Sequence, residues 1–175
     1  AIAAPQTSSA TITIDENSTV TINLGDFTTG DPTSYTIVSN PVHILENSFQ
    51  ESGSGMFTYN HSGSEAPTDT FSFSATNGDG TSNTSTVTIN VTNVNDAPTI
   101  DAISKTIEEG SSVEIVVVGK DAENAELTII NGNASNGTVS KNFSTGVLTY
   151  THDGSDTITD SFTVTATELA NTVNG

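Results

Sequence analysis

The sequence Gly55-Met-Phe-Thr-Tyr-Asn-His-Ser-Gly-Ser-Glu65 returns in the second half of the chain as Gly146-Val-Leu-Thr-Tyr-Thr-His-Asp-Gly-Ser-Asp156. Further matches keep the same order: Ala4-Pro5 with Ala97-Pro98, Ile14-Asp15-Glu16 with Ile107-Glu108-Glu109, and Thr68-Asp69-Thr70-Phe71 with Thr159-Asp160-Ser161-Phe162. A period of about ninety residues indicates an internal repeat, in which each copy is one structural unit. The 175-residue chain therefore accommodates two small domains, predicted at residues 1–95 and 96–175.

Alternating apolar and polar residues predict that each copy is built from short β-strands. In the first copy the pattern occurs at Ala10–Ile14 and Thr19–Leu24, from Tyr35, from Phe57, at Phe71–Ala75 and at Ser85–Val91. Six or seven such strands in about ninety residues are typical of an immunoglobulin-like sandwich. The predicted fold class is therefore all-β, with two tandem immunoglobulin-like or cadherin-like β-sandwich domains.

The same pattern predicts which side chains form the cores. The side chains expected on inward strand faces are Ile12, Ile14, Val20, Ile22 and Leu24, and the expected core aromatics are Tyr59, Phe71 and their repeats Tyr150 and Phe162. Asn77-Gly78-Asp79-Gly80 offers residues that tolerate positive φ, which predicts a hairpin before the last strand of the first copy.

The second copy repeats this pattern through Phe162–Ala166. The counterpart of the Ser85–Val91 strand would begin just past Gly175, so the second sandwich is predicted to lack its last strand. An open strand edge favours association. Two explanations stay open: the chain is a fragment of a longer repetitive protein, or another copy donates the strand.

The charge balance excludes several classes of partner. The chain has 21 acidic residues against three lysines and no arginine, a formal charge of −18. Nucleic acid and anionic membranes would be repelled. No apolar run approaches the roughly 18 residues of a membrane span, and Ala1–Pro5 has no signal-peptide pattern, so any targeting signal is expected to lie outside this sequence.

Residues for catalysis are scarce. The chain has no cysteine, no arginine and no spaced histidine pair, which disfavours zinc, thiol and phosphoryl-transfer chemistry. His61 and His152 precede Ser or Asp, Gly and Ser at equivalent repeat positions, so we expect the imidazoles to bond turn backbones in both copies. An enzyme is the least expected class.

Oxygen-bearing side chains gather at the ends of the predicted strands and in the junction Thr92-Asn-Val-Asn-Asp-Ala-Pro98. Calcium takes six to eight such oxygens. The candidate calcium ligands are Glu16, Glu65, Asp69, Asn93, Asn95, Asp96, Asp121, Glu123 and Glu168. Glu65 and Asp69 are alternatives for one place in this set, and the whole set could instead be ordinary turn acids.

The order of these residues resembles the inter-domain calcium site of cadherin repeats. Val-Asn-Asp-Ala-Pro, Tyr-Thr-His-Asp-Gly-Ser and Asp-Ser-Phe-Thr-Val look more like the bacterial cadherin-like repeats of large secreted, RTX-type adhesins. The resemblance covers nearly the whole chain and implies a Ca²⁺ site in the linker. Asn93, Asn77 and Ser62 depart from the pattern, each by the loss of one charge, which implies weaker affinity or fewer ions.

The expected function is a calcium-rigidified extender repeat of an extracellular or cell-surface bacterial adhesin, whose partners are the neighbouring repeats of the same chain. One alternative is a polysaccharide-binding module, for which Phe27, Phe49 and Phe143 are the aromatics that could be exposed. The other is a filament subunit that joins another copy through its open strand edge.

Overall fold

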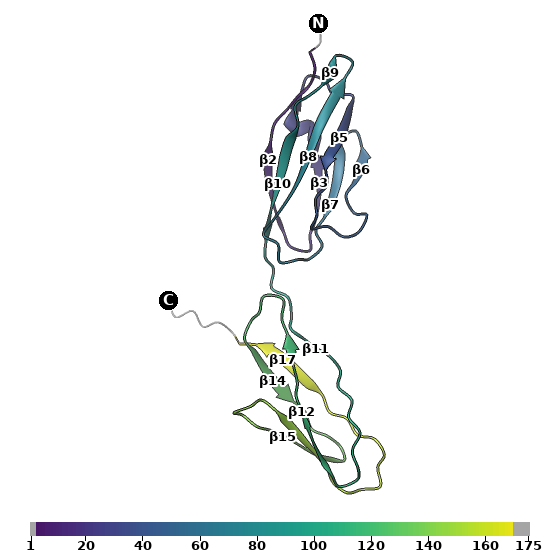
Figure 1. Ribbon diagram of the computed structural model, residues 1–175, viewed down its shortest axis with the longest axis vertical. Helices are drawn as coiled ribbons and strands as arrows, with labels where there is room; N and C mark the ends of the chain where they lie inside the picture. The colour runs from purple at the N-terminus through teal and green to yellow at the C-terminus, as the bar shows by residue number, and fades with distance from the viewer. Residues whose placement is uncertain (1–2, 170–175) are drawn as a thin grey trace, which may run out of the picture. The chain divides into compact units, whose positions relative to one another are not determined.

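The computed structural model describes residues 3–169, and these residues form two compact all-β units that divide between Val94 and Asn95 (Figure 1). The predicted fold class is confirmed. Among the described residues the helical element is one 3-10 turn, η1 (Leu24–Phe27), and no helix is long and apolar enough to cross a membrane.

The first unit contains two main sheets. Its strands are β1 (Gln6–Thr7), β2 (Ala10–Asp15), β3 (Thr19–Asn23), β4 (Thr28–Thr29), β5 (Ser34–Ser39), β6 (Gln50–Gly53), β7 (Met56–Asn60), β8 (Thr68–Asn77), β9 (Gly80–Thr81) and β10 (Ser85–Thr92). One sheet has the order β2-β10-β8-β5 with β9 on β8, and the other has the order β3-β7-β6. The strands follow the predicted alternation, and the predicted hairpin joins β8 to β9 by pairing Asn77 with Gly80.

The core of the first unit lies between these sheets. Its buried members are Ile22, Leu24, Phe57, Tyr59, Phe71, Phe73, Val87 and Ile89, and Ile12, Ile14 and Val20 pack against them. The predicted inward faces are therefore confirmed. Leu24 is fully buried, but it begins η1 rather than ending a strand, because its carbonyl accepts the hydroxyl of Thr28 and turns the chain.

The second unit repeats this plan with shorter ladders. Its strands are β11 (Thr99–Ile100), β12 (Ser112–Ile115), β13 (Gly119–Lys120), β14 (Leu127–Asn131), β15 (Gly137–Lys141), β16 (Leu148–His152) and β17 (Val164–Glu168). Their sheets are β12-β16-β15, β14-β17 and β11-β13. The buried core is Ile115, Leu148 and Tyr150, with Phe162 packed against it.

The predicted strand at Phe162–Ala166 is displaced toward the C-terminus in the structure. β17 starts at Val164, which pairs with Asn131, the last residue of β14. Phe162 thus lies beyond the end of that ladder. It contributes an aromatic side chain to the core, stacked on Tyr150 at 6.2 Å between ring centroids, but no strand pairing.

Residues 3–169 contain no counterpart of β10 in the second unit. In the first unit β10 lies between β2, which it pairs in parallel, and β8. In the second unit β17 pairs with β14 alone among the described residues, and residues 101–108, which follow β11 as β2 follows β1, form no strand. The core side chains of the second unit are less completely shielded from solvent than those of the first. Phe71, Phe73 and Val87 of the first unit are fully buried.

Both predicted structural histidines occupy the same turn in their units. The N–H of Gly63 donates to Nδ1 of His61 at 3.2 Å, and the N–H of Gly154 donates to Nδ1 of His152 at 3.1 Å. Both side chains are buried. The prediction that these imidazoles bond turn backbones is confirmed.

Candidate metal centre

The linker segment between the units has no regular secondary structure. β10 ends at Thr92 and β11 begins at Thr99, and residues 93–98 pair with no strand. Their backbone and amide N–H groups are therefore available to side chains, and four consecutive linker residues use them to bond four glutamates.

On the side of the first unit the linker bonds Glu16 and Glu65. The backbone N–H of Val94 donates to Oε2 of Glu16 at 3.3 Å, and Nδ2 of Asn93 donates to Oε2 of Glu65. Glu16 is only 4% exposed, and its second oxygen, Oε1, is buried without a hydrogen-bond partner among the described residues. A buried carboxylate oxygen without a partner is costly, because it has lost its hydration without gaining a hydrogen bond.

The strand register explains why Glu16 reaches the linker. β10 runs parallel to β2, with Val91 opposite Ile14 and Thr92 opposite Asp15. The ladder continues one bond further, because the N–H of Glu16 donates to the carbonyl of Thr92 at 2.9 Å. Strands β2 and β10 therefore end side by side, at Asp15 and Thr92, and the linker starts beside Glu16.

On the side of the second unit the linker bonds Glu168 and Glu123. Nδ2 of Asn95 donates to Oε1 of Glu168 at 2.9 Å, and the backbone N–H of Asp96 donates to Oε1 of Glu123 at 3.1 Å. Glu168 is the last residue of β17, opposite Leu127. Oε2 of Glu123 is buried and has no partner among residues 3–169.

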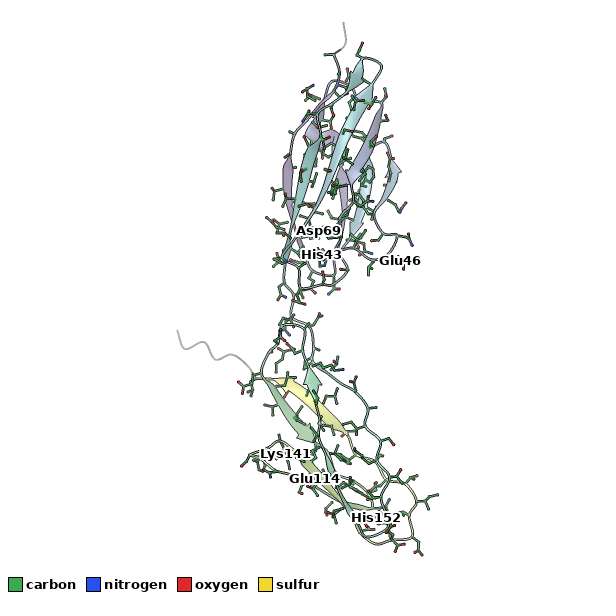
Figure 2. The ribbon with its side chains drawn as sticks, viewed as in Figure 1. His43, Glu46, Asp69, Glu114, Lys141 and His152 are labelled. Atoms are coloured by element: carbon green, nitrogen blue, oxygen red, sulfur yellow. The ribbon has the colours of Figure 1, made fainter. Side chains whose placement is uncertain are left out.

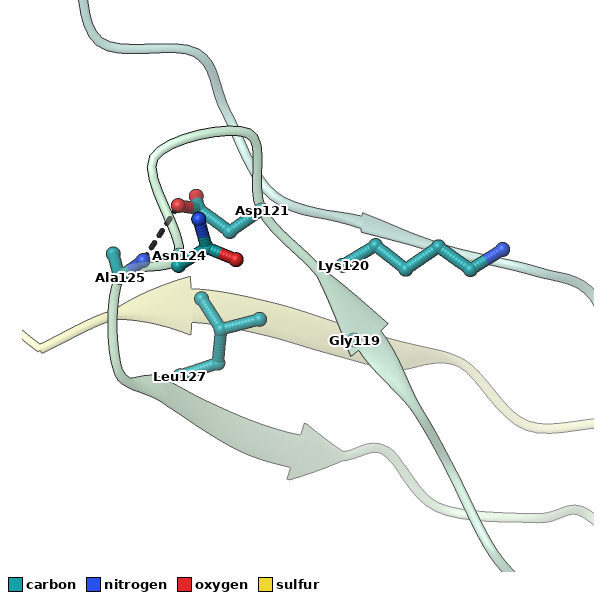
Figure 3. Close-up of a pocket in the computed structure, with 6 residues that line it drawn as sticks. All are labelled: Gly119, Lys120, Asp121, Asn124, Ala125 and Leu127. Carbon is teal, nitrogen blue, oxygen red and sulfur yellow. Dashed lines mark hydrogen bonds between the residues drawn. The ribbon is translucent and has the colours of Figure 1, made fainter.

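Asp121 presents a third vacant oxygen. It follows β13, and its Oδ1 accepts the backbone N–H of Ala125 at 2.7 Å, as the dashed line in Figure 3 shows. Asn124 closes this turn at a φ of +60°. Oδ2 of Asp121 is buried without a partner in the described chain, beside an open pocket of about 410 Å³ whose other lining residues are Gly119, Lys120, Asn124, Ala125 and Leu127.

The donor set matches the chemistry of a hard cation. Glu16 and Glu65 lie at the linker end of the first unit, and Glu123 lies at the linker end of the second. They bring oxygen alone, which suits calcium, whereas the imidazole and thiolate ligands typical of zinc are missing from the set. In the described part of the chain, the exposed side chain of Lys120 forms an ion pair with exposed Asp101.

Asp69 has a different role from the other candidate ligands. It is 3% exposed, and its oxygens accept the N–H groups of Val42, His43 and Thr70 at 2.8–3.1 Å and the hydroxyl of Tyr59 at 3.0 Å. Figure 2 labels Asp69 and His43 in the first unit. These four internal donors give Asp69 a structural role in the first unit.

The second unit repeats this arrangement at Asp160, which accepts the hydroxyl of Tyr150 at 2.9 Å and the N–H groups of Ser135, Asn136 and Ser161. Partial burial alone would raise the pKa of the Asp160 carboxyl, but these donated hydrogen bonds outweigh it and lower the pKa. In the first unit, burial and the neighbouring Asp69 raise the pKa of Tyr59. A Thr-Asp-x-Phe motif whose Asp lies ten residues after a core Tyr is the sequence signal of this pair.

The aromatics considered for polysaccharide binding are mostly internal. Phe27 and Phe49 pack against the first core, and Phe49 lies 4.9 Å from the ring of Phe71 and 5.3 Å from that of Phe57. Phe143 is 92% exposed, with Nζ of Lys141 6.0 Å from its ring centroid. Of the three expected exposed aromatics, Phe143 is exposed, whereas Phe27 and Phe49 are only partly exposed because their rings pack against the hydrophobic core.

The acidic side chains are visible in the sequence, but the groups that donate hydrogen bonds to them are not. The backbone N–H groups of Val94 and Asp96 each donate to a glutamate, and the side chains of these two residues give no indication of it. A backbone donor leaves no signal in the residue type. Only the strand register, which brings Glu16 to the start of the linker, reveals its partner.

Comparison with known proteins agrees with the fold. The family described as Bacterial Ig domain matches the chain twice, at residues 2–90 and 95–174. No curated protein sequence matches it. Among solved structures, the titin domains Z1Z2 in complex with telethonin share 18% identity over 97% of this chain and 92% of theirs, with a TM-score of 0.40.

Cadherin domains are also similar. Protocadherin gamma B2 extracellular cadherin domains 3–6 share 14% identity over 94% of this chain and 47% of theirs, with a TM-score of 0.48. The human desmocollin-1 ectodomain shares 12% identity over 96% of this chain and 37% of its own, with a TM-score of 0.43. At such identities the likeness concerns the fold alone.

Proposed function

The chain belongs to the bacterial Ig domain family, and we propose that its two domains form an extender segment whose linker is stiffened by calcium. The observation that carries the proposal is the run of four consecutive linker residues, each bonded to a different glutamate. Asn93 and Val94 bond Glu65 and Glu16 of the first unit. Asn95 and Asp96 bond Glu168 and Glu123 of the second.

The vacant oxygens support an ion rather than a plain hydrogen-bonded turn. Glu16 Oε1, Glu123 Oε2 and Asp121 Oδ2 are buried and have no partner among the described residues. A divalent cation would satisfy these oxygens and neutralise carboxylates that otherwise repel one another. The residues proposed to hold it are Glu16, Glu65, Asn93, Asn95, Asp96, Asp121, Glu123 and Glu168.

The mechanism is mechanical and involves no catalysis. Without the ion, the carboxylates of the linker ends repel, and the linker, which has no strand pairing, is free to bend. With the ion bound, oxygens from both domains would coordinate the same cation, so bending the linker would break some of these coordination bonds. A chain of such domains becomes stiffer as the calcium concentration rises.

The setting that fits this mechanism is outside the cell, where calcium reaches the millimolar range in which extracellular modules bind it. Bacterial Ig domains are typical of surface and secreted proteins, and the chain carries no cysteine that an oxidising environment would pair. The proposed host protein is an adhesin or related surface protein, in which neighbouring repeats are the direct partners.

Calcium titration of the whole 175-residue chain tests the proposal. Isothermal calorimetry would detect the ion, small-angle scattering would report the distribution of shapes, and thermal melting would report stability. We expect a narrower shape distribution and a higher melting temperature at millimolar calcium, with magnesium as the matched control because it tolerates fewer protein ligands. An unchanged scattering profile at millimolar calcium would refute the extender function.

A second candidate function is strand exchange between copies. It is favoured by β17, whose only strand partner in the described chain is β14. An unpaired edge accepts a further strand through backbone hydrogen bonds. The mass of the protein in solution at several concentrations would test this: a constant monomer mass removes this candidate.

A further inference from the structure

Two asparagines of the linker point their amide groups at glutamates. Nδ2 of Asn93 bonds Oε2 of Glu65, and Nδ2 of Asn95 bonds Oε1 of Glu168. An ionised carboxylate has no proton to donate, so the side of the amide that faces it must be the nitrogen. Asn93 and Asn95 therefore each direct Nδ2, and not Oδ1, toward the glutamate to which they are hydrogen-bonded.

We infer that Asn93 and Asn95 are ion substitutes: their N–H groups occupy Glu65 and Glu168 in the ion-free chain, and the same amides turn over to present Oδ1 when calcium binds. The binding half of this inference rests on the proposed calcium site, whereas the ion-free half rests on the hydrogen bonds alone. The consequence is that the ion must displace two internal hydrogen bonds, so these residues set the affinity of the site.

The geometry explains why asparagine is useful at both positions. An aspartate would be a stronger calcium ligand, but in the ion-free chain it would place a second negative charge beside Glu65 or Glu168. An amide of the same shape supplies a donor to the carboxylate in one orientation and an acceptor to the ion in the other. The linker end of each domain thereby keeps its order at low calcium, when the carboxylates would otherwise repel.

Elsewhere in the first unit, the side-chain amide of Asn77 also acts as a hydrogen-bond donor, in this case to backbone carbonyls. Asn77 takes the repeat position that Glu168 takes in the second unit, one residue after the matching Ala-Thr pair. Its Nδ2 donates to the carbonyls of Ala3 at 3.0 Å and Gly30 at 2.8 Å. At that position one amide joins two chain segments by donating to both, which an ionised carboxylate, having no N–H, could not do directly.

The test compares Asn93→Asp and Asn95→Asp with the unaltered full chain, first in chelator and then in a calcium titration. In chelator we expect both variants to melt at a lower temperature. In calcium we expect each to bind the ion about tenfold more tightly, because a hydrogen bond to a charged group, whose net worth corresponds to roughly that factor, no longer competes with the ion.

Asn23→Asp is the matched control. Nδ2 of Asn23 also donates to a carboxylate, Oδ1 of Asp26, at 2.9 Å, in an exposed position of the first unit. Its Oδ1 accepts the N–H of Gly25, an interaction that aspartate retains. This substitution adds the same charge and loses the same kind of hydrogen bond, so it should lower the melting temperature in chelator and leave calcium affinity unchanged.

The side-chain amide signals of Asn93 and Asn95 in nuclear magnetic resonance give a direct readout. We expect them to be hydrogen-bonded in chelator and to shift as calcium saturates the chain. Calcium binding with unmoved amide signals, or linker variants that melt like the unaltered chain in chelator, would overturn the inference while leaving the calcium site intact. Destabilised linker variants in a chain that binds no calcium would instead refute the proposed function and keep the ion-free role of the amides.

Discussion

Glu16 accepts the backbone N–H of Val94 at 3.3 Å with one carboxylate oxygen, while its other oxygen is buried and has no partner within residues 3–169. The side chain is 4% exposed. Half of this carboxylate is therefore held by the linker, and the other half is a desolvated charge that a cation would compensate. The relationship joins the end of strand β2 directly to the segment that separates the two domains.

Glu16→Gln should weaken calcium binding sharply. The amide keeps the size of the side chain but removes the charge and one ligand oxygen, so we expect a loss of affinity of about tenfold or more. Because a neutral buried amide is less costly than an unpaired charge, the variant should be at least as stable as the unaltered chain in chelator. Calorimetry and thermal melting measure the two effects, with exposed Glu46→Gln as the control for the lost charge.

Asp69→Asn should destabilise the first unit and leave calcium binding intact. The amide nitrogen would face either the N–H of His43 or those of Val42 and Thr70, so donors would oppose one another. A cost of about 2–3 kcal/mol is expected for the lost charged hydrogen bonds. Denaturant unfolding measures it, with exposed Asp79→Asn as control. A marked loss of calcium affinity would restore Asp69 as a ligand.

The second unit should lose stability in acid through Asp160. Its carboxyl pKa is lowered in the folded chain, so its contribution is present above the ordinary aspartate pKa of about 3.9 and is lost as the pH falls through the lower folded value. Asp160→Asn should flatten this part of the pH dependence. Unfolding of the unaltered chain and of Asp160→Asn between neutral pH and about pH 2 would show the difference, and parallel pH profiles of the two proteins would contradict it.

Tyr59 should make the first unit sensitive to alkali. The pKa of its hydroxyl is raised by burial and by Asp69, so the stabilisation is complete below the ordinary tyrosine pKa of about 10 and is lost as the pH rises above it. Tyr59→Phe should cost about 1–3 kcal/mol at neutral pH, because Asp69 loses a hydrogen bond. The variant should also remove the alkaline loss, which unfolding curves at pH values above about 9 would detect.

Much of the fold was predictable because it depends on local pattern. Alternation placed Ile22 and Phe71 in the core, and the match between Tyr59 and Tyr150 revealed two units. The displaced strand at Phe162 shows where local pattern stops, since a strand requires a partner and β14 ends opposite Val164. The partial burial of Phe49 was not predictable for the same reason, because it depends on the distant ring of Phe71.

The sequence by itself determined the duplicated all-β plan, the strongly acidic character and the residue types that could ligate calcium, since periodicity and composition are properties of the chain alone. Tertiary structure decided which carboxylates are free to act. It satisfied Asp69 with four internal donors and left Glu16 with a vacant oxygen beside the linker. The physical reason is that a carboxylate's role depends on the donors that surround it, and those donors come from strands and loops far away in the chain.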